Sequence, residues 1–415
     1  MNIPDRLRLK NFSLFDGVDF FDQPGFMLTV SNGRISHLER SEMPPDGSVV
    51  TLDLGGATVM PGLIDAHFHC NSPTLDVASI DQLYPSYLAQ FARQHLEETL
   101  LRGFTTVRDA GGADYGLVQA VDNGYIKGPR LYISGRALSQ TGGHGDLRPQ
   151  GAVDVCGCAY RGALAAVVDG ADAVRQAVRD ELRKGAHQIK LFVSGGVLSP
   201  TDPIWMNQFT SAEIKAAVEE AATRRTYVMA HAHTAEASRR CAEAGVRSIE
   251  HGTQIDRQTA ETIARHGAYV VPTITVMESL LNSSGHGLPQ SALDKLKSII
   301  DDAARAIDHC MEAGVKLGLG TDLFGGLHGR ELHELTARTR MNGALETLRS
   351  ATSVNAEILN KKGELGIICE GAIADLLVVN ANPVENMGLF EAPDDNILLI
   401  MKNGEIVKSK FHQYL

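Results

Sequence analysis

Eight short strand-like runs, most followed by an amphipathic helical pattern, constrain the fold of this 415-residue chain more than any other feature. Helical patterns such as 171–186 and 211–225 lie between the runs, and the second of these opens with Thr210 and Glu213 in capping-box spacing. Strands that alternate with helices predict a parallel sheet, and eight such units predict a (β/α)8 TIM-like barrel of the α/β class. The runs are 62–69, 104–110, 130–137, 188–194, 227–233, 247–252, 268–274 and 315–322.

The two ends of the chain share a different pattern of short β-like runs. These runs are "RLRLKNF", "GFMLTV", "ISHLER" and "VVTLDL" near the N-terminus, and "ADLLVVN" and "ILLIMKNGEIVK" near the C-terminus. Asn-Gly pairs at 32–33 and 403–404 are strong hairpin signals. We therefore expect residues 1–60 and 365–415 to form one small β-sandwich domain, while residues 61–364 form the barrel.

Charge and composition narrow the classes of function. The formal net charge is −11 and no basic run occurs, which argues against a nucleic-acid partner. The N-terminal segment lacks the apolar centre of a signal peptide, and no stretch approaches the roughly 18 apolar residues of a membrane span. Six cysteines in so long a chain do not suggest a disulfide framework, and Cys156 and Cys158 are interpreted as free loop thiols. We expect a reduced, cytoplasmic protein with no membrane partner.

Metal-compatible side chains gather at the carboxyl ends of the predicted barrel strands. The first strand ends in "DAHFHC", and residues two apart in a strand share a face, so His67 and His69 are expected to converge. His231 ends the fifth strand, His251 the sixth and Asp322 the eighth. Catalytic residues of such barrels lie at this end, where imidazoles and a carboxylate form a site for a divalent metal. Their common position favours a metal site over scattered structural residues.

Lys190 has the same position on the fourth strand, inside the apolar run "QIKLFVS". Lysine is almost never fully buried without a partner, so this side chain either snorkels from a strand edge or has a chemical role. Burial lowers the pKa of a lysine and favours the neutral amine, which is the form that reacts with CO2.

These motifs, "PGLIDAHFH", the central Lys190, "HAHT", "EHG" and "GTD" in this order, resemble the binuclear amidohydrolase superfamily over nearly the whole chain. In that family the lysine of the fourth strand is carbamylated by CO2, and the carbamate bridges two metal ions. The resemblance implies a ligand set at the strand ends: His67, His69 and Asp322 for the buried ion, His231 and His251 for the outer ion, and Lys190 for the bridge.

The charge of such a site supports the carbamate. An ammonium group at Lys190 would add a positive charge beside two divalent cations, whereas a carbamate replaces it with a negative one. Zinc is the default ion for histidine and carboxylate ligands, although manganese, cobalt and iron fit the same set. The resemblance thus implies two divalent ions and hydrolysis of an amide by a metal-bridged hydroxide.

Three residues are candidates for catalysis or for the pocket. Asp322 is placed to take a proton from the attacking water and pass it to the leaving nitrogen. His144 lies in the Gly-rich loop "SQTGGHGD" after the third strand. Resemblance to the dipeptidase, carboxypeptidase and ochratoxinase branches implies that His144 contacts the substrate carbonyl or oxyanion, and a loop histidine packed by glycines is the alternative. His233 shares a strand face with His231, as either a pocket residue or a structural histidine.

Other candidate substrate contacts lie in loops. Trp205, in the loop after the fourth strand, could line an apolar subsite or pack its own loop. His328 and Arg330 follow the eighth strand, and an arginine there could bind a substrate carboxylate in a bidentate manner. Arg136 and Arg161 are competitors for that role.

Three hypotheses follow. The leading one is a metal-dependent dipeptidase, carboxypeptidase or amidase that releases a C-terminal amino acid from dipeptides or small N-acyl amino acids such as ochratoxin A. The second is hydrolysis of a cyclic amide, as by imidazolonepropionase; the bridging lysine fits this chemistry but counts against mononuclear deaminases. The third is a non-catalytic barrel scaffold, which would be free to lose the ligands. The resemblance also implies a small-molecule substrate and a homo-oligomer, an octamer in many relatives.

Overall fold

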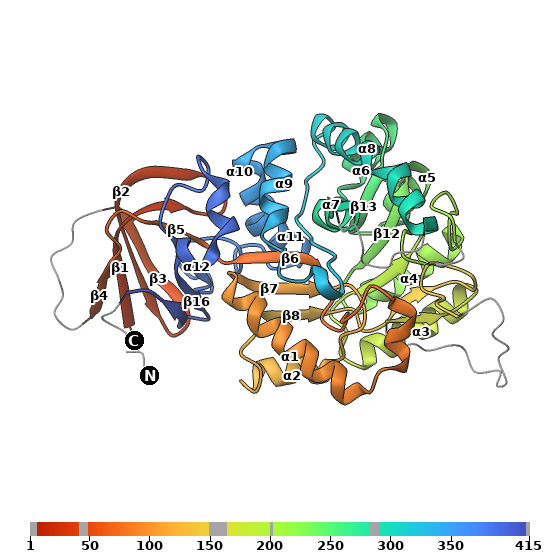
Figure 1. Cartoon of the computed structure of the whole chain (residues 1–415), viewed down its shortest axis with the longest axis horizontal. Helices are drawn as coiled ribbons and strands as arrows, with labels where there is room; N and C mark the ends of the chain where they lie inside the picture. The colour runs from red at the N-terminus through yellow and green to blue at the C-terminus, as the bar shows by residue number, and fades with distance from the viewer. Residues whose placement is uncertain (1–5, 41–48, 149–163, 200–201, 283–289, 412–415) are drawn as a thin grey trace. The chain divides into compact units, whose positions relative to one another are not determined.

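The computed structural model describes residues 6–40, 49–148, 164–199, 202–282 and 290–411 (Figure 1). The chain divides into two compact units. Unit 1 comprises Met1–Asp65, Glu97–Thr106 and Leu332–Leu415, and unit 2 comprises Ala66–Leu96 and Val107–Glu331.

Unit 1 is built around one mixed sheet of eight strands, to which both ends of the chain contribute. The strand order is β17-β16-β15-β5-β1-β2-β3, with β4 paired to β1. The strands are β1 (Arg6–Phe15), β2 (Phe20–Ser31), β3 (Arg34–Arg40), β4 (Val50–Asp53), β5 (Thr58–Pro61), β15 (Leu376–Val379), β16 (Ile397–Lys402) and β17 (Glu405–Ser409). The structure therefore joins the two chain ends in one sheet, as the sequence predicts.

Both Asn-Gly pairs form the expected hairpin turns. Asn32 and Gly33 have φ angles of 51° and 73° between the antiparallel strands β2 and β3. Asn403 and Gly404 have φ angles of 52° and 79° between β16 and β17. Two central residues in left-handed conformation match the twist of the flanking strands, and Asn and Gly adopt it at low cost. These two predictions are confirmed.

Two further sheets carry the strand-and-helix part of the chain. One has the order β6-β7-β8, and the other is a parallel sheet with the order β10-β9-β11-β12-β13-β14. The strands are β6 (Leu63–Phe68), β7 (Phe104–Asp109), β8 (Arg130–Ile133), β9 (Ala137–Ser139), β10 (Ala165–Val167), β11 (Ile189–Phe192), β12 (Val228–Thr234), β13 (Ser248–Gln254) and β14 (Tyr269–Val271).

Helices follow most of these strands. The α-helices are α1 (Pro85–Leu101), α2 (Tyr115–Asp122), α3 (Ala171–Arg183), α4 (Ser211–Thr223), α5 (Ala235–Ala244), α6 (Arg257–His266), α7 (Ile274–Asn282), α8 (Gln290–Glu312), α9 (His333–Asn342), α10 (Ala344–Arg349), α11 (Asn355–Ile358) and α12 (Pro393–Asn396). Short 3-10 turns are η1 (Val77–Gln82), η2 (Gly325–Leu327) and η4 (Met387–Glu391), and η3 (Ser350–Val354) is a π-helical turn. The capping box of α4 is present, with Thr210 and Glu213 bonding reciprocally.

The third predicted run, 130–137, is wrong as a single strand. It breaks after Ile133 into β8 and β9, which belong to different sheets. Gly135 lies at the break with a φ angle of 66°, a left-handed conformation that ends a strand. The short strand β10, which pairs with β9, was not among the predicted runs.

The eighth predicted run, 315–322, forms no assigned strand. One parallel bridge pairs Leu317 with Val270 of β14, and the Leu319 carbonyl accepts the N–H of Ala66 in β6. Glycines in its "GLG" stretch weaken a continuous ladder. The run therefore lies between the last and the first strand. Two backbone hydrogen bonds join it to Val270 of β14, and three join it to Ala66 and His67 of β6.

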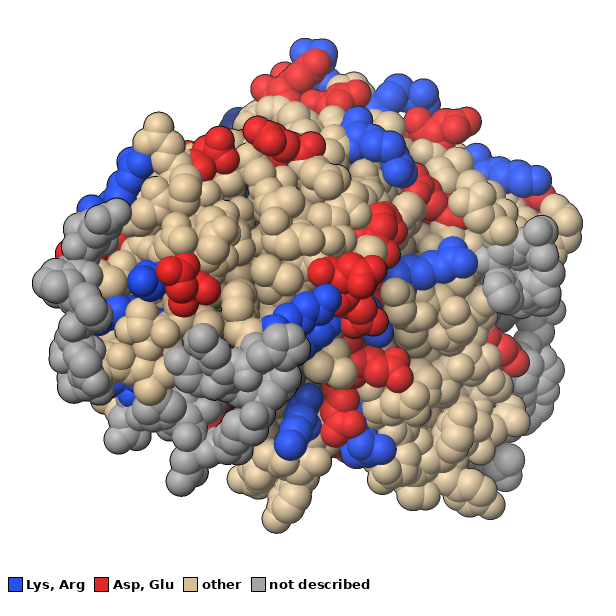
Figure 2. All heavy atoms as spheres, turned by 60° about the vertical axis from the view of Figure 1, so that its left-hand side comes forward, with Lys and Arg blue, Asp and Glu red and all other residues tan. Residues whose placement is uncertain are grey.

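The described surface and helices add two observations. On the face drawn in Figure 2, basic side chains lie beside acidic ones instead of gathering in a patch of one sign. Within the described ranges, no helix is both long and apolar enough to cross a membrane. Cys156, Cys158 and Arg161, and most of the loop expected at 281–290, lie outside the described residues.

Candidate metal centre and active site

Three ligand-type side chains converge in what we call the cavity cluster: His67, His69 and Asp322. His67 lies in β6, His69 just after it, and Asp322 at the end of the eighth run. The Nε2 atoms of both histidines lie 3.3 Å and 3.2 Å from the same carboxylate oxygen of Asp322. One ligand atom from each of the three residues falls within 4.8 Å of the others. Residues two apart in a strand share a face, and the imidazoles of His67 and His69 do face the same Asp322 carboxylate.

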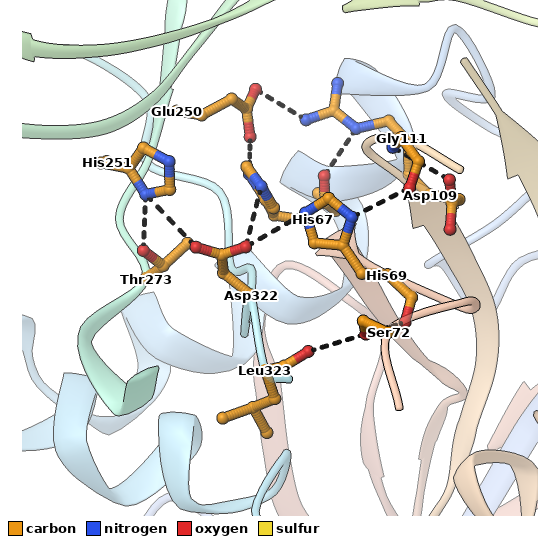
Figure 3. A network of polar contacts seen from close by, with 12 residues as sticks. His67, His69, Ser72, Asp109, Gly111, Glu250, His251, Thr273, Asp322 and Leu323 are labelled. Atoms are coloured by element: carbon orange, nitrogen blue, oxygen red, sulfur yellow. Dashed lines mark hydrogen bonds and ion pairs between the residues drawn. The ribbon is translucent and has the colours of Figure 1, made fainter. Parts of the chain in front are cut away.

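Acceptors behind the two imidazoles fix their orientation (Figure 3). His67 Nδ1 lies 2.8 Å from a Glu250 oxygen, and His69 Nδ1 lies 3.1 Å from the Gly111 carbonyl. Because both acceptors take the Nδ1 proton, both Nε2 atoms keep the lone pair that a metal needs. Arg108 binds the other Glu250 oxygen at 3.0 Å, and both of these side chains are fully buried. Burial raises the pKa of Glu250, but the Arg108 charge and the His67 hydrogen bond outweigh it and bring the pKa to about 2.

His251 reaches the same centre through an unusual backbone conformation. Glu250 already faces His67, and in a regular strand the next residue would point to the opposite side. His251 has a φ angle of 70°, which turns its ring back toward Asp322, with Nδ1 4.0 Å from a carboxylate oxygen. The same Nδ1 lies 2.8 Å from Thr273 Oγ1. Asp322 also has a positive φ angle, 54°, so two candidate ligands occupy a conformation that costs energy and often marks functional sites.

Lys190 is buried in β11, with 1% of its surface exposed. Within the described residues, no hydrogen bond or ion pair holds its Nζ atom, which lies over the Phe192 ring at 5.6 Å from the ring centroid. Burial lowers the pKa of Lys190 to about 8, although Glu250 and Asp322 oppose the shift. A buried lysine that lines a cavity without an acid partner is a candidate for chemical modification.

His231 and His251 complete the group of candidate ligands. Their ring centroids lie 4.6 Å apart, and His231 Nε2 lies 3.1 Å from the Gly195 carbonyl. Burial lowers the pKa of both imidazoles well below the usual range; for His231 the charge of His144 adds to the effect. Both rings are therefore neutral near pH 7, the form in which histidine binds a metal.

His144 lies over this group on a loop. Its ring stacks on His231 at a centroid distance of 4.4 Å, and it lines the same cavity. Its Nδ1 atom lies 2.8 Å from Ser199 Oγ and 3.3 Å from a carboxylate oxygen of Asp202. Since an ionised carboxylate only accepts, Nδ1 carries the proton and Nε2 is the atom left for a ligand. His233 also lines the cavity, but its Nδ1 is engaged with Thr253 at 2.9 Å.

The cavity above these side chains has apolar walls. Helices α7 and α8, the loop after β11 and the stretches around residues 147, 164 and 324 supply most of them. The apolar lining residues include Leu147, Leu164, Val197, Leu198, Val276, Met277, Leu280, Leu296 and Phe324. The cavity thus combines polar side chains at the strand ends with apolar walls around them. This combination favours a small ligand with a non-polar group.

The family is decided by the comparison with known proteins. The profile of the amidohydrolase family matches residues 58–407. The chain belongs to this family. Ochratoxinase from Aspergillus niger is 33% identical over 371 residues, which cover 84% of this chain and 75% of that protein. A solved prolidase in complex with N-methylphosphonate-L-proline is 41% identical, with a TM-score of 0.92 over 98% of this chain and 100% of that one. A Xaa-Pro dipeptidase with methionine in its active site is 31% identical, with a TM-score of 0.88 over 97% and 100%.

This protein is thus an amidohydrolase, and it lies among the dipeptidase and ochratoxinase branches. Its side chains fit divalent cations well. The cavity cluster offers two free imidazole nitrogens and a carboxylate, while acceptors behind the rings fix the tautomers. Two imidazole nitrogens and a carboxylate are the ligand types that a metal-binding hydrolase uses.

The structure does not bring every predicted contact to the cavity of the amidohydrolase. Trp205 is 76% exposed and does not line it. Arg330 is exposed and reaches Ser279 at 3.4 Å, and Arg136 is held by Glu181 at 2.8 Å. Among the described residues that line the cavity, none is an arginine. The apolar residues named above line the cavity, which is a role that the sequence allows for Trp205.

His328 belongs to a second group, which we call the packed cluster: His95, His328 and Glu331. One ligand-type atom of each lies within 4.8 Å of the others. His328 Nε2 lies 2.9 Å from the Ser72 carbonyl, and none of the three lines the cavity. The structure therefore places His328 in a buried network of its own.

Sequence reasoning missed the residues that orient the ligands. Glu250 and Arg108 each interrupt an apolar strand with a charge, which is the signal that drew attention to Lys190. The same argument applied to "RSIEHG" and "FTTVRDA" would have found both residues. Asp202 and Ser199 lie in a loop, where no periodicity marks them.

Proposed function

We propose that this amidohydrolase cleaves the amide bond of dipeptides or small N-acyl amino acids and releases a C-terminal amino acid. The observation that carries the proposal is the pair of His67 and His69 Nε2 atoms facing Asp322, with Lys190 buried beside them and lacking an acid partner among the described residues. The relatives support the substrate class: a prolidase with a proline phosphonate, a Xaa-Pro dipeptidase, and an ochratoxinase, so ochratoxin A is one candidate substrate.

The residues that would hold two divalent ions are those at the strand ends. We assign His67, His69 and Asp322 to the inner ion, His231 and His251 to the outer ion, and a carbamate of Lys190 to the bridge, with Zn²⁺ as the expected metal. Such ions would supply an acidified water as nucleophile and polarise the scissile carbonyl. The lowered pKa of Lys190 supports the carbamate, because more of the amine is neutral near pH 7 and able to react with CO2.

The protein's own side chains then carry out the proton and charge chemistry. Asp322 accepts the proton of the attacking water and delivers it to the leaving nitrogen. Burial raises the pKa of Asp322, but His67 and His69 outweigh it and hold the pKa well below the usual range, so the carboxylate is ionised before the water attacks. With a proton on Nε2 as well as on Nδ1, His144 donates from Nε2 to the carbonyl oxygen and stabilises the negative charge that develops there. The apolar walls exclude water around the substrate side chain.

The proposal includes a closed (β/α)8 barrel over 61–364 and a β-sandwich formed by 1–60 and 365–415. Two backbone hydrogen bonds support closure because they continue the sheets across both gaps: the Ala66 N–H donates to the Leu319 carbonyl, and the His187 N–H donates to the Ile133 carbonyl. We also propose a homo-oligomer, with an octamer as the first state to test by light scattering.

The experiment is a hydrolysis screen over dipeptides, N-acyl amino acids and ochratoxin A, on metal-loaded enzyme. Each hit is paired with its carboxamide, which removes the free carboxylate of the leaving amino acid. Loss of a charge-assisted hydrogen bond would lower kcat/KM for the carboxamide by roughly 10- to 150-fold. Equal turnover of the pair would refute release of a C-terminal amino acid and would favour cyclic-amide hydrolysis.

A further inference from the structure

Lys295, on helix α8, donates from a single Nζ atom to three backbone carbonyls. The distances are 3.0 Å to Gly196, 2.9 Å to Ser199 and 2.6 Å to Asp202. The three carbonyls belong to the loop after β11, almost one hundred positions before Lys295 in the sequence. An ammonium group has three protons, so this arrangement uses its full donor capacity on one loop.

The same three residues surround the ring of His144. Ser199 Oγ and an Asp202 oxygen face its Nδ1 atom at 2.8 Å and 3.3 Å. Gly196 packs against the ring so closely that a Cβ atom there would lie 2.1 Å from a ring carbon. Lys295 therefore gathers the three residues that fix the position of His144.

Hydrogen bonds within the loop tie these contacts into one unit. The Asp202 oxygen that faces His144 also accepts the Gly196 N–H at 3.1 Å and the Gln208 side-chain N–H at 3.2 Å. Asp202 is fully buried, so its charge is not screened by water. A buried carboxylate with several donors defines a single geometry for the imidazole that it faces.

We propose that Lys295 is a positioning residue, which holds Gly196, Ser199 and Asp202 so that His144 presents its Nε2 atom to the substrate. The inference rests on the proposed function, in which His144 stabilises the developing oxyanion. Lys295 itself touches no reacting atom, since its three donors are engaged with the loop. Its effect is exerted through the ring of His144, because a displacement of about 1 Å at such a group costs on the order of a hundredfold in rate.

The test compares Lys295→Met with Lys297→Met, an exposed lysine of the same helix that serves as the matched control. We expect Lys295→Met to lower kcat/KM by about 10- to 100-fold, mainly through kcat, with the metal content unchanged. In a His144→Gln background the same substitution should cost less than about twofold, because the residue through which it acts is already gone. A full additional loss in that background would overturn the proposal.

A spectroscopic readout separates this proposal from the proposed function. In ¹⁵N–¹H spectra of the histidine side chains, the His144 signal is assigned by its loss in His144→Gln. Lys295→Met should shift that signal and leave Lys297→Met spectra unchanged, whether or not any amide substrate has been found. An unshifted His144 signal would refute the role of Lys295. If Lys295→Met does not fold, Lys295→Gln, which keeps two N–H donors, takes its place with a smaller expected shift.

Discussion

The cavity cluster and the packed cluster contain the same ligand types, two histidines and one carboxylate, yet their surroundings give them different chemistry. In the cavity cluster, Glu250 and Gly111 occupy the Nδ1 atoms of His67 and His69. Both Nε2 atoms are then left to face Asp322 at the wall of a cavity. The Nε2 lone pairs of His67 and His69 are therefore on the side of the cluster that a ligand in the cavity can reach.

In the packed cluster the ring nitrogens are used differently. His95 Nε2 faces Glu331 at 3.4 Å, and His328 Nε2 is engaged with the Ser72 carbonyl. The two rings lie 3.8 Å apart, and Phe68 stacks on His95 at 4.6 Å. Burial, together with His95, lowers the pKa of His328 to about 3, so its ring is neutral.

The identity and spacing of the ligand-type residues are therefore not sufficient to make a metal site. The deciding features are which nitrogen of each imidazole remains free and whether it faces accessible space. We infer that the cavity cluster binds metal and that the packed cluster stabilises the fold. Five substitutions test this comparison.

Lys190→Ala should have the largest effect, because in the proposed site the carbamate of Lys190 bridges the two ions held by the cavity residues. We expect loss of most of the second metal and nearly all activity, with the far-UV circular dichroism spectrum retained. Partial rescue by added short carboxylates would support the carbamate. Two metals per chain and normal turnover would show that the lysine is no bridge.

Asp322→Asn should keep the fold and much of the metal while removing the proton acceptor. We expect kcat to fall by at least about a hundredfold, the lower range for a positioned acid–base group. Steady-state kinetics on metal-loaded protein measure the effect. A loss below tenfold would assign proton transfer to another residue, and His144 is the first candidate.

Glu250→Gln and Glu331→Gln form a matched pair across the two clusters. Glu250→Gln weakens the acceptor behind His67 and should lower metal affinity by about 10- to 100-fold, measured by competition with a chelator. Glu331→Gln should leave metal affinity unchanged. If both variants lose affinity equally, the two clusters do not differ in the way inferred here.

His328→Asn should have the smallest effect on activity. It removes the donor to the Ser72 carbonyl, and we expect the free energy of unfolding to fall by about 1–3 kcal/mol in urea titrations. Metal content and kcat/KM should stay within about twofold of the wild type. Loss of a metal equivalent would identify the packed cluster as a binding site.

Much of the candidate site follows from local sequence rules. The period of two in a strand placed His67 and His69 on one face, and the position of each ligand after an apolar run marked the strand ends. The buried charge of Lys190 was also visible, because a lone charge inside an apolar run is rare. In the structure these residues do lie around one cavity.

The orientation of each ligand could not be predicted in this way. His251 follows Glu250 directly, and alternation would send the two side chains to opposite faces. The positive φ angle of His251 brings both to the same centre. That conformation is maintained by neighbours such as Thr273, which lies on another part of the fold.

Local patterns in each strand predicted the kinds of chemical group in the site and their place at the ends of the strands, since each strand carries these patterns alone. Long-range packing fixed three other features: the nitrogen of each imidazole that is free, the place of His328 in a packed network, and the lack of a described arginine in the cavity wall. The physical reason is that the partners come from distant parts of the chain. Arg108 meets Glu250 across 142 positions, and Lys295 meets Gly196 across 99. Hydrogen bonds of this kind form only when the fold brings the two segments together, and no local period in the sequence records them.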